Sequence, residues 1–352
     1  MQLVDPMPPA VVKSQFEWVT YNEPEGHLDN LAARLEKLPG IGPAARIVGF
    51  TYKDDTTLSR FNRRGYSNTY RLDMKADLKL QDACAGLESI QAMLTRALAS
   101  ELAARHGRAD LLLVRHVLEH AHDPAAFVAA LRELVKPGGH MLFEMPDSAK
   151  FIAACDYSFI WEEHITYFSE ETFAAFISGA GLELRETITY PYPLEDSLIG
   201  IVQNGEKTAI DGSERVSPES LVAGGQVFAQ RFSELQSRMQ SLFRAWRDSG
   251  KRIAIFGAGH LATKFINLFA LTDFIECVID DNPHKQAVLM PGSRLPIRGS
   301  GALTDIDVCL LSLNPESEQK VLAKNQPFLD RGGQFLSIFA LSPKTVYSAS
   351  AA

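Results

Sequence analysis

The sequence has 352 residues, 46% hydrophobic and 22% charged, a mixture typical of globular proteins. Since a domain usually has about 150 residues, this length predicts two domains. The net charge of −8 argues against a general nucleic-acid or anionic-membrane partner, because both bind clustered positive charge. No apolar run approaches the roughly 20 residues of a membrane-spanning helix, and the N-terminus MQLVDPMPPAVV lacks the pattern of a signal peptide.

The cysteines are scattered along the chain. None of the four forms a CxxC pair, so the spacing predicts neither a zinc site nor a disulfide framework. We expect reduced, buried thiols in a cytoplasmic protein. The four are Cys84, Cys155, Cys277 and Cys309.

The first 200 residues alternate between apolar runs and helical spacings. Residues 1–25 are expected to form an extended arm, and the amphipathic segment 27–38 predicts a helix that ends at Pro39-Gly40. This alternation favours a doubly wound parallel sheet over residues 26–200. The predicted strands are 47–50, 68–72, 110–114 and 140–144, and the predicted helices are 91–104 and 124–135, with a turn at 136–139.

A second alternation follows a connecting region. Residues 201–250 are expected to form a linker and a long helix, because apolar residues recur every three or four positions over 226–248. The predicted strands beyond it are 252–256, 276–279, 307–313 and 334–339, with a helix from Leu261. The sequence thus predicts an α/β protein with two Rossmann-like doubly wound domains joined by a long helix, the second at 251–345.

Strand 252–256 leads into a Gly-x-Gly-x-x-Ala turn, GAGHLA, at residues 257–262. Glycine permits a tight turn and the close approach of a phosphate, which then binds the N–H groups of the following helix. An acidic residue about 20 positions on would accept ribose hydroxyls, and Asp280 or Asp281 fits. The pattern favours a nucleotide or nucleotide-sugar site. The alternatives are an NAD site and a turn that only packs the helix on the sheet.

Strand 110–114 leads into VRHVLEH, residues 114–120, at the carboxyl end where open α/β sheets bind ligands. A second segment, WEEHITYF at 161–168, interleaves charged and aromatic residues. Two histidines with acidic neighbours suit proton transfer near neutral pH. One alternative is metal binding, although no obvious third ligand accompanies His116 and His120. Another is that the histidines are ordinary core or surface residues.

Several strings together carry a family resemblance. VRHVLEHAHDPAAF resembles the region after the donor site in class I methyltransferases, and DYSFIWEEHITYF resembles the Tyr-x-Glu-His region of sugar C-methyltransferases. IAIFGAGHLATKF with CVIDDNPHKQ resembles the C-terminal domain in which that family holds a nucleotide-sugar. The arm resembles the stretch after the family's small zinc-binding module. Nearly the whole chain is therefore similar to the nucleotide-sugar C-methyltransferases.

The resemblance implies an activity and a set of roles. The family moves a methyl group from S-adenosylmethionine to a sugar carbon beside a ketone, through an enolate, in deoxysugar, polysaccharide or natural-product biosynthesis. It implies a nucleotide-sugar substrate, S-adenosylmethionine as cofactor and no metal, and leaves the oligomeric state open. The implied catalytic residues are His120, Glu163 and His164, and the implied substrate-binding residues are Trp161, Tyr167, Gly257, Gly259, Lys264, Asp280 and Lys285.

The chain departs from the family pattern in three places. These 352 residues contain no cysteine cluster of the kind expected for the zinc module, and Trp161 replaces the family's tyrosine, so proton transfer is left to the histidines. GFTYKDDT at 49–56 replaces the donor loop Glu-x-Gly-x-x-x-Gly, and β-carbons there narrow the approach of the donor. The expected donor-binding residues are Thr51, Asp54, Asp55, Asp73 and Arg115. The alternatives are a relative that binds a nucleotide-sugar without methylating it and an NAD-linked enzyme.

Overall fold

The computed structural model describes residues 5, 8, 23–80, 87–161, 163–193, 195–205 and 218–350. The chain forms two compact units, an N-terminal unit of residues 1–149 and 161–217 and a C-terminal unit of residues 150–160 and 218–352. The C-terminal unit thus includes a short segment from the middle of the chain. Most of the expected arm, Cys84 and the connection 206–217 lie outside the described residues.

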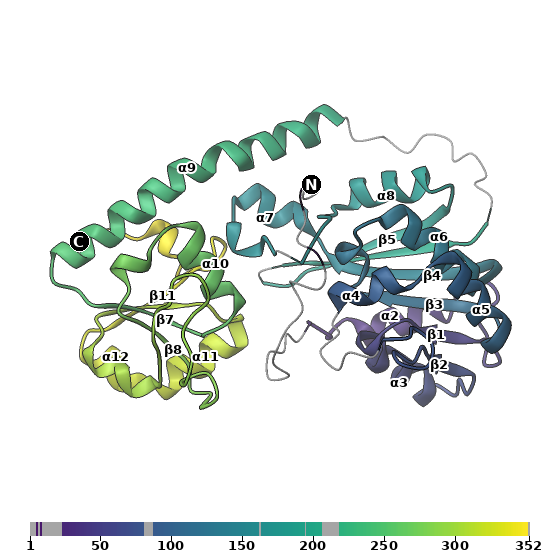
Figure 1. The fold of residues 1–352 in the computed structure, drawn as a ribbon, viewed down its shortest axis with the longest axis horizontal. Helices are drawn as coiled ribbons and strands as arrows, with labels where there is room; N and C mark the ends of the chain where they lie inside the picture. The colour runs from purple at the N-terminus through teal and green to yellow at the C-terminus, as the bar shows by residue number, and fades with distance from the viewer. Residues whose placement is uncertain are drawn as a thin grey trace. The chain divides into compact units, whose positions relative to one another are not determined.

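The N-terminal unit is built on a six-stranded sheet with the order β2-β1-β3-β4-β6-β5 (Figure 1). The first four strands are parallel, and β6 runs antiparallel to both of its neighbours. The expected parallel sheet is therefore extended by an antiparallel pair. The strands are β1 (Ile47–Gly49), β2 (Thr69–Arg71), β3 (Ala109–Arg115), β4 (Val135–Pro146), β5 (Glu183–Tyr190) and β6 (Ser197–Gln203).

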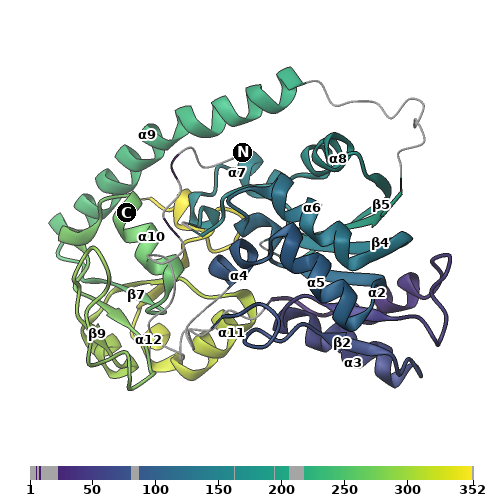
Figure 2. The same ribbon diagram turned by 45° about the vertical axis from the view of Figure 1, so that its right-hand side comes forward.

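Helices cover both faces of this sheet (Figure 2). Alternate side chains of the central strands enter two separate cores, as the pleat of a strand requires. Leu111 packs with α2 and α3, whereas Leu112 packs with α4, α5, α6 and α8. The helices are α2 (Leu28–Leu35), α3 (Asp55–Arg63), α4 (Leu87–Met93), α5 (Arg96–His106), α6 (Pro124–Leu134) and α8 (Glu170–Gly179); α7 (Ser148–Ala154) lies across the boundary of the units.

Two local predictions differ from the structure. The predicted helix 91–104 is two helices, because the Thr95 side chain accepts a hydrogen bond from the N–H of Leu98 and starts α5 anew. The predicted turn 136–139 lies inside β4, which has a register shift opposite β3. Strand β5, which no pattern predicts, is only half-buried along its length and so lacks a clear apolar alternation.

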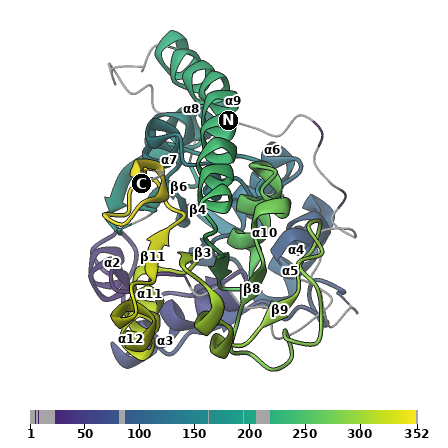
Figure 3. The ribbon, with the colours of Figure 1, turned by 90° about the vertical axis from the view of Figure 1, so that its left-hand side faces the viewer.

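The C-terminal unit contains a five-stranded parallel sheet in the order β11-β10-β7-β8-β9 (Figure 3). Helix α10 lies on one side of the sheet, and α11 and α12 lie on the other. The strands are β7 (Ile253–Phe256), β8 (Cys277–Ile279), β9 (Ile297–Arg298), β10 (Val308–Leu311) and β11 (Gln334–Ser337), and the helices are α9 (Pro218–Asp248), α10 (His260–Leu268), α11 (Pro315–Lys324) and α12 (Gln326–Asp330).

The long helix α9 and the segment 150–160 both pack within the C-terminal unit. The apolar stripe of α9 buries Met239 and Trp246. The hydroxyl of Tyr157, from the segment, donates a hydrogen bond to the carbonyl of Phe228 on this helix. Among the described residues, no helix combines the length and apolar character needed to cross a bilayer.

The two glycines after β7 differ in what a side chain would meet. Gly257 has φ of +104°, and a Cβ there would lie 2.7 Å from Leu313 and 2.8 Å from Ser312. Gly259 has φ of −134°, and a Cβ there would meet nothing within 4 Å. The first glycine is therefore required by the fold itself, whereas the second is not.

We expect Gly257→Ala to lower the free energy of unfolding by roughly 2–4 kcal/mol, because it combines backbone strain with overpacking. Gly259→Ala is the matched control and should cost no more than about 1 kcal/mol as a change at a helix N-cap. Denaturant or thermal unfolding measures both. Equal destabilisation by the two variants contradicts this account of the turn.

Candidate functional site

Each sheet has a switch point, where the connections from neighbouring strands leave in opposite directions. In the N-terminal unit it lies between β1 and β3, and in the C-terminal unit between β7 and β10. Open α/β sheets bind ligands there, outside the carboxyl ends of the strands. The loops that begin at residues 50 and 116 therefore form one candidate site, and the loops that begin at residues 257 and 312 form another.

The loop after β1 is closed by the buried carboxylate of Asp54. Its Oδ2 accepts hydrogen bonds from the N–H groups of Phe50 and Thr51, at 2.8 and 2.9 Å, and its Oδ1 accepts one from the N–H of Arg115 at 3.2 Å. Burial raises the pKa of Asp54 to about 7, although these N–H groups and the Arg115 charge oppose the rise. The carboxylate fills the inside of the loop.

A second buried charge lies beside this loop, at the carboxyl ends of β3 and β4. The Arg115 guanidinium is 1% exposed and donates to Glu144 and to the carbonyl of Lys53. Glu144 also lies 3.0 Å from His27 and 3.4 Å from His116. Although burial opposes it, the positive charges of Arg115 and His116 hold the pKa of Glu144 well below its ordinary value. We call Arg115, His116, Glu144 and His27 the charged cluster.

The end of the N-terminal arm lies against the same loop. Glu23 pairs with Lys53 at 3.1 Å, and Glu25 accepts a hydrogen bond from the Thr56 hydroxyl at 2.6 Å. Glu25 also lies 3.9 Å from Arg115. These acidic side chains compensate part of the buried positive charge. The loop is therefore covered as well as internally closed.

The expected donor-binding residues divide into two groups. Thr51, Asp54 and Arg115 are buried and bonded to other parts of the unit, and Asp55 pairs with Arg71 at 2.8 Å. Asp73 lies just beyond β2 and is exposed; its Oδ1 accepts two backbone hydrogen bonds, and within the described residues its Oδ2 accepts none. Asp73 therefore keeps one carboxylate oxygen without a partner among the described residues, and such an oxygen suits a ribose hydroxyl.

The residues after β3 meet the segment 161–168 as a second group, which we call the histidine cluster: Glu119, His120 and His164. The carbonyl of Glu119 accepts hydrogen bonds from the N–H groups of Ile165 and Thr166, at 2.7 and 3.1 Å, and so ties the two segments together. The His120 and His164 rings lie edge to face with centroids 4.8 Å apart. The structure thus brings together two histidines that are 44 positions apart in sequence.

Hydrogen bonding orients the His120 ring. Its Nδ1 lies 2.9 Å from the carbonyl oxygen of Glu163. Because a carbonyl can only accept, Nδ1 carries the proton, and the network therefore assigns the lone pair to Nε2. This tautomer leaves a lone pair on Nε2 of His120, as a proton acceptor needs.

Trp161 and Tyr167 form one wall beside His164. The ring centroids of Trp161 and Tyr167 lie 5.9 and 6.0 Å from that of His164. The Tyr167 hydroxyl accepts from the N–H of Trp161 and donates to its carbonyl, at 2.8 and 2.9 Å. Tyr167 therefore shapes the loop, and Trp161, which is 8% exposed, offers little surface to a ligand.

In the C-terminal unit, the glycine turn is held open by an acidic residue of the next strand. Asp280 Oδ2 accepts a hydrogen bond from the N–H of Ala258 and pairs with the ammonium of Lys285, each at 3.0 Å. Gly259 is the N-cap of α10 and has no capping side chain, so the first N–H groups of that helix point to the switch point. Gly257, Gly259, Asp280 and Lys285 thus lie together.

Lys264 has a different partner. Lys264 is 9% exposed, and its ammonium donates a 2.6 Å hydrogen bond to the carbonyl of Ser158. The carboxylate of Asp156 lies in the same segment and accepts a hydrogen bond from the N–H of Ala340. Lys264 therefore secures the segment 150–160 to the C-terminal unit and does not lie at the turn with the other predicted nucleotide-binding residues.

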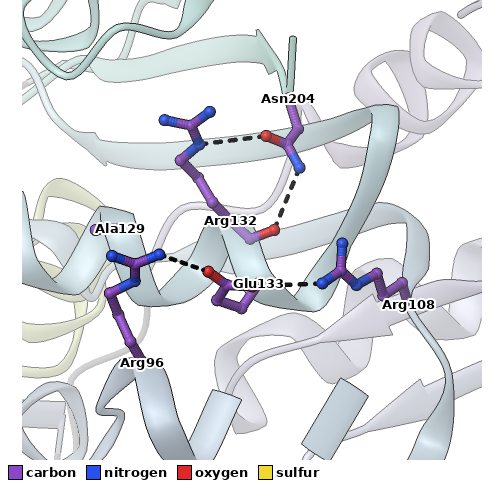
Figure 4. Close-up of a pocket in the computed structure, with 6 residues that line it drawn as sticks. All are labelled: Arg96, Arg108, Ala129, Arg132, Glu133 and Asn204. Atoms are coloured by element: carbon purple, nitrogen blue, oxygen red, sulfur yellow. Dashed lines mark hydrogen bonds and ion pairs between the residues drawn. The ribbon is translucent and has the colours of Figure 1, made fainter. Parts of the chain in front are cut away.

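A cavity of about 330 Å³ lies at the other end of β4 (Figure 4). Glu133 pairs there with Arg96 at 2.8 Å and with Arg108 at 3.4 Å. Asn204, also in the wall, receives a hydrogen bond from Arg132 and bonds the carbonyl of Gly139 through its N–H. This cavity lies at the amino end of the strand and is not part of the candidate site.

Sequence reasoning did not identify His27 and Glu144 as site residues. Glu144 carried a usable signal, because it is a charged residue at the carboxyl end of an otherwise apolar strand. His27 carried none, since it precedes an amphipathic helix more than 100 positions away from its partner. Only the folded chain brings the two within 3.0 Å.

Two family models match different parts of the chain. Residues 31–187 match a methyltransferase domain. Residues 219–340 match the C-methyltransferase C-terminal domain. The first match lies in the N-terminal unit apart from residues 150–160, the second lies in the C-terminal unit, and together they cover most of the chain.

Individual relatives are more distant. The chain is 26% identical over 271 residues to the C-methyltransferase NovU of Streptomyces niveus, which covers 71% of this chain and 62% of the relative. It is 31% identical over 105 residues to the ubiquinone biosynthesis O-methyltransferase of Aromatoleum aromaticum, 27% of this chain and 45% of that protein. The chain therefore spans less than two thirds of the length of either relative.

A solved methyltransferase is also similar in part. It is the 1,6-didemethyltoxoflavin-N1-methyltransferase of Burkholderia thailandensis with bound 1,6-didemethyltoxoflavin and S-adenosylhomocysteine. The match has 15% identity and a TM-score of 0.35, and it covers 52% of this chain and 80% of that one. A likeness this weak supports no argument about the site.

His116 makes the charged cluster sensitive to pH. Although burial lowers it, the carboxylates of Glu23, Glu119 and Glu144 raise the pKa of His116 from 6.5 to about 10. The resulting stabilisation is complete below about pH 6.5 and is lost as the pH rises through about 10. The φ of His116 is +52°, which asparagine tolerates better than most residues.

We expect His116→Asn to lower the free energy of unfolding at pH 6.5, because it leaves the three carboxylates without their partner. The difference from the unsubstituted protein should shrink by up to a few kcal/mol as the pH approaches 10, since one pKa unit is worth about 1.4 kcal/mol. Denaturant unfolding of both proteins across this range gives the difference. A difference independent of pH contradicts a protonated His116.

Proposed function

We propose that this chain, which matches a methyltransferase domain over residues 31–187 and the C-methyltransferase C-terminal domain over residues 219–340, methylates a carbon beside the ketone of a keto-deoxy nucleotide-sugar. The carrying observation is the histidine cluster at the carboxyl end of β3, with an oriented His120. The similarity to a C-methyltransferase supports carbon as the methyl acceptor. The glycine turn in the C-terminal unit supports a nucleotide-bearing substrate.

The proposed chemistry begins with removal of a proton. His120 Nε2 accepts the proton from the carbon beside the ketone, the C–H bond breaks, and the electron pair moves into an enolate. His164 lies next to His120, and Glu163 fixes the His120 tautomer through its carbonyl. Positioned imidazole bases of this kind contribute typically about 10²–10⁴-fold to rate. S-adenosylmethionine, when bound, supplies an electrophilic methyl group.

The residues fit one end of that donor better than the other. Asp73, exposed just after β2, suits the ribose hydroxyls. The loop after β1, which would receive the methionine end, is occupied by the Asp54 carboxylate and by the buried positive charge of Arg115. A buried cation is a poor neighbour for a sulfonium, because like charges repel strongly at low dielectric.

The closed loop supports a second candidate function. In this alternative the chain binds a nucleotide-sugar and performs proton chemistry beside its ketone, such as epimerisation, without methyl transfer. Both candidates use the same base and the same glycine turn. They differ only in whether the loop after β1 admits the donor.

Methyl transfer and proton removal can be measured separately. With S-adenosylmethionine and a panel of keto-deoxy nucleotide-sugars, we expect a product heavier by one methylene group in mass spectra. Without the donor, in D₂O, we expect deuterium to enter beside the ketone. His120→Ala should lower both rates by about 10²–10⁴-fold. His122→Ala, two positions away and outside the histidine cluster, is the matched control.

The outcomes separate the two candidates. Deuterium exchange without methyl transfer, and without heat on titration with S-adenosylmethionine, supports the non-methylating relative and rejects the methyltransferase. Methyl transfer rejects the alternative. If neither reaction occurs with any substrate of the panel, or if His120→Ala leaves both rates unchanged, the assignment of the base is wrong.

Nucleotide binding at the glycine turn is tested by Gly259. Because a Cβ at this position meets no protein atom within 4 Å, Gly259→Ala should leave the fold intact and obstruct only a phosphate that approaches the backbone. We expect it to weaken binding of nucleoside diphosphates at least about tenfold in calorimetric titration, with little change in Tm. Unchanged affinity places the nucleotide elsewhere, and tighter binding of NAD supports an NAD-linked enzyme.

A further inference from the structure

The Glu119 side chain is buried and makes no hydrogen bond through its carboxylate. It is 2% exposed, and among the described residues neither Oε1 nor Oε2 has a hydrogen-bond partner. Nδ1 of His116 lies 3.6 Å from Oε1, but the same ring also lies within 4 Å of Glu23 and Glu144. One imidazole shared by three carboxylates leaves Glu119 short of partners, and a further cation beside it would stabilise it.

Two imidazoles lie beside this carboxylate. One ligand atom from each of Glu119, His120 and His164 can be chosen so that all three lie within 4.8 Å of one another. The Nδ1–H of His120 donates to the carbonyl of Glu163, which leaves Nε2 as the ligand atom. Metal-binding histidines almost always donate their other ring N–H in this way, to a carbonyl or a carboxylate.

The backbone holds the ligands in place. Glu119 and His120 are consecutive residues of the short 3₁₀ helix η2 (Leu118–His120), and two hydrogen bonds to the Glu119 carbonyl fix the segment that carries His164. His116 is not part of this set of three, although its ring lies 3.6 Å from Glu119. Its charge balances the neighbouring carboxylates of the charged cluster instead.

From this geometry we propose that Glu119, His120 and His164 form a binding site for a divalent first-row transition metal ion, with Zn²⁺ as the representative ion. Two imidazoles and one carboxylate are the ligands of the catalytic zinc in several hydrolases and of non-haem iron centres. Mg²⁺ is disfavoured, because it prefers oxygen ligands. Three protein ligands leave at least one position for a ligand from outside the chain.

This site has a consequence that rests on the proposed function. An ion bound by these three residues would have an open coordination position for the oxygen of a ketone, which it would polarise. The Nε2 atom of His120 cannot bind an ion and accept a proton at the same time. Binding of an ion therefore competes with proton removal by His120, so bound metal should slow deuterium exchange.

Metal binding is tested on the full chain without any substrate, so its result is independent of the proposed activity. After treatment with a chelator and desalting, the protein is titrated with Zn²⁺ by calorimetry and with Co²⁺ by visible absorption. We expect one ion per chain and a Co²⁺ spectrum of a site with nitrogen ligands. Glu119→Gln and His120→Ala should each weaken binding at least about tenfold, whereas His122→Ala should leave it unchanged.

A second measurement needs no variant and so remains informative if a substitution prevents folding. An ion that binds only the folded chain raises its Tm. We expect Zn²⁺ to raise the Tm of the unsubstituted protein, a chelator to reverse the rise, and Mg²⁺ to have no effect. Absence of binding, or binding that survives both substitutions and is therefore adventitious, overturns the proposal. If the chain binds metal but a chelator leaves the rate of deuterium exchange unchanged, the metal site is separate from the proposed proton chemistry.

Discussion

The buried carboxylate of Asp54 joins three parts of the N-terminal unit through backbone hydrogen bonds. It accepts from the start of the loop after β1 and from the N–H of Arg115, the last residue of β3. The Arg115 side chain then extends the network to Glu144 at the end of β4. Removing a partner from such a network leaves a charge unpaired in a region of low dielectric, which is costly. The carboxyl ends of three strands thus depend on one another.

This network fixes the position of the histidine cluster. His116 follows Arg115 directly, and its left-handed φ turns the chain away from the strand into the short helix that carries Glu119 and His120. A strained backbone of this kind persists only where its surroundings determine it. The N–H of His116 donates to the carbonyl of Glu144, so the strand end that holds the charged cluster also positions the segment that carries Glu119 and His120.

The two halves of the molecule therefore differ in kind. In the C-terminal unit, the glycine turn leaves the N-terminus of a helix uncapped, and its acidic residue supports the turn from the side. In the N-terminal unit, the equivalent place after β1 is filled by protein atoms. The residues proposed to handle protons are close together, and the loop that would receive a methyl donor is closed. Both proposed functions therefore use the same proton acceptor, and they differ only in whether the loop after β1 admits the methyl donor.

The sequence by itself determined the two α/β domains, because their strands are long apolar runs separated by clear turn and helix signals, as at 110–114 and 252–256. It also identified the glycine turn and both histidine segments, since motifs at strand ends report the local backbone. It could not determine that Asp54 accepts a hydrogen bond from Arg115, that Lys264 secures a distant segment, or that Glu119 and His120 lie near His164. Those facts depend on contacts between residues far apart in the chain, and only the packing of the sheet decides which charged side chains are neutralised inside the protein and which remain to meet a ligand.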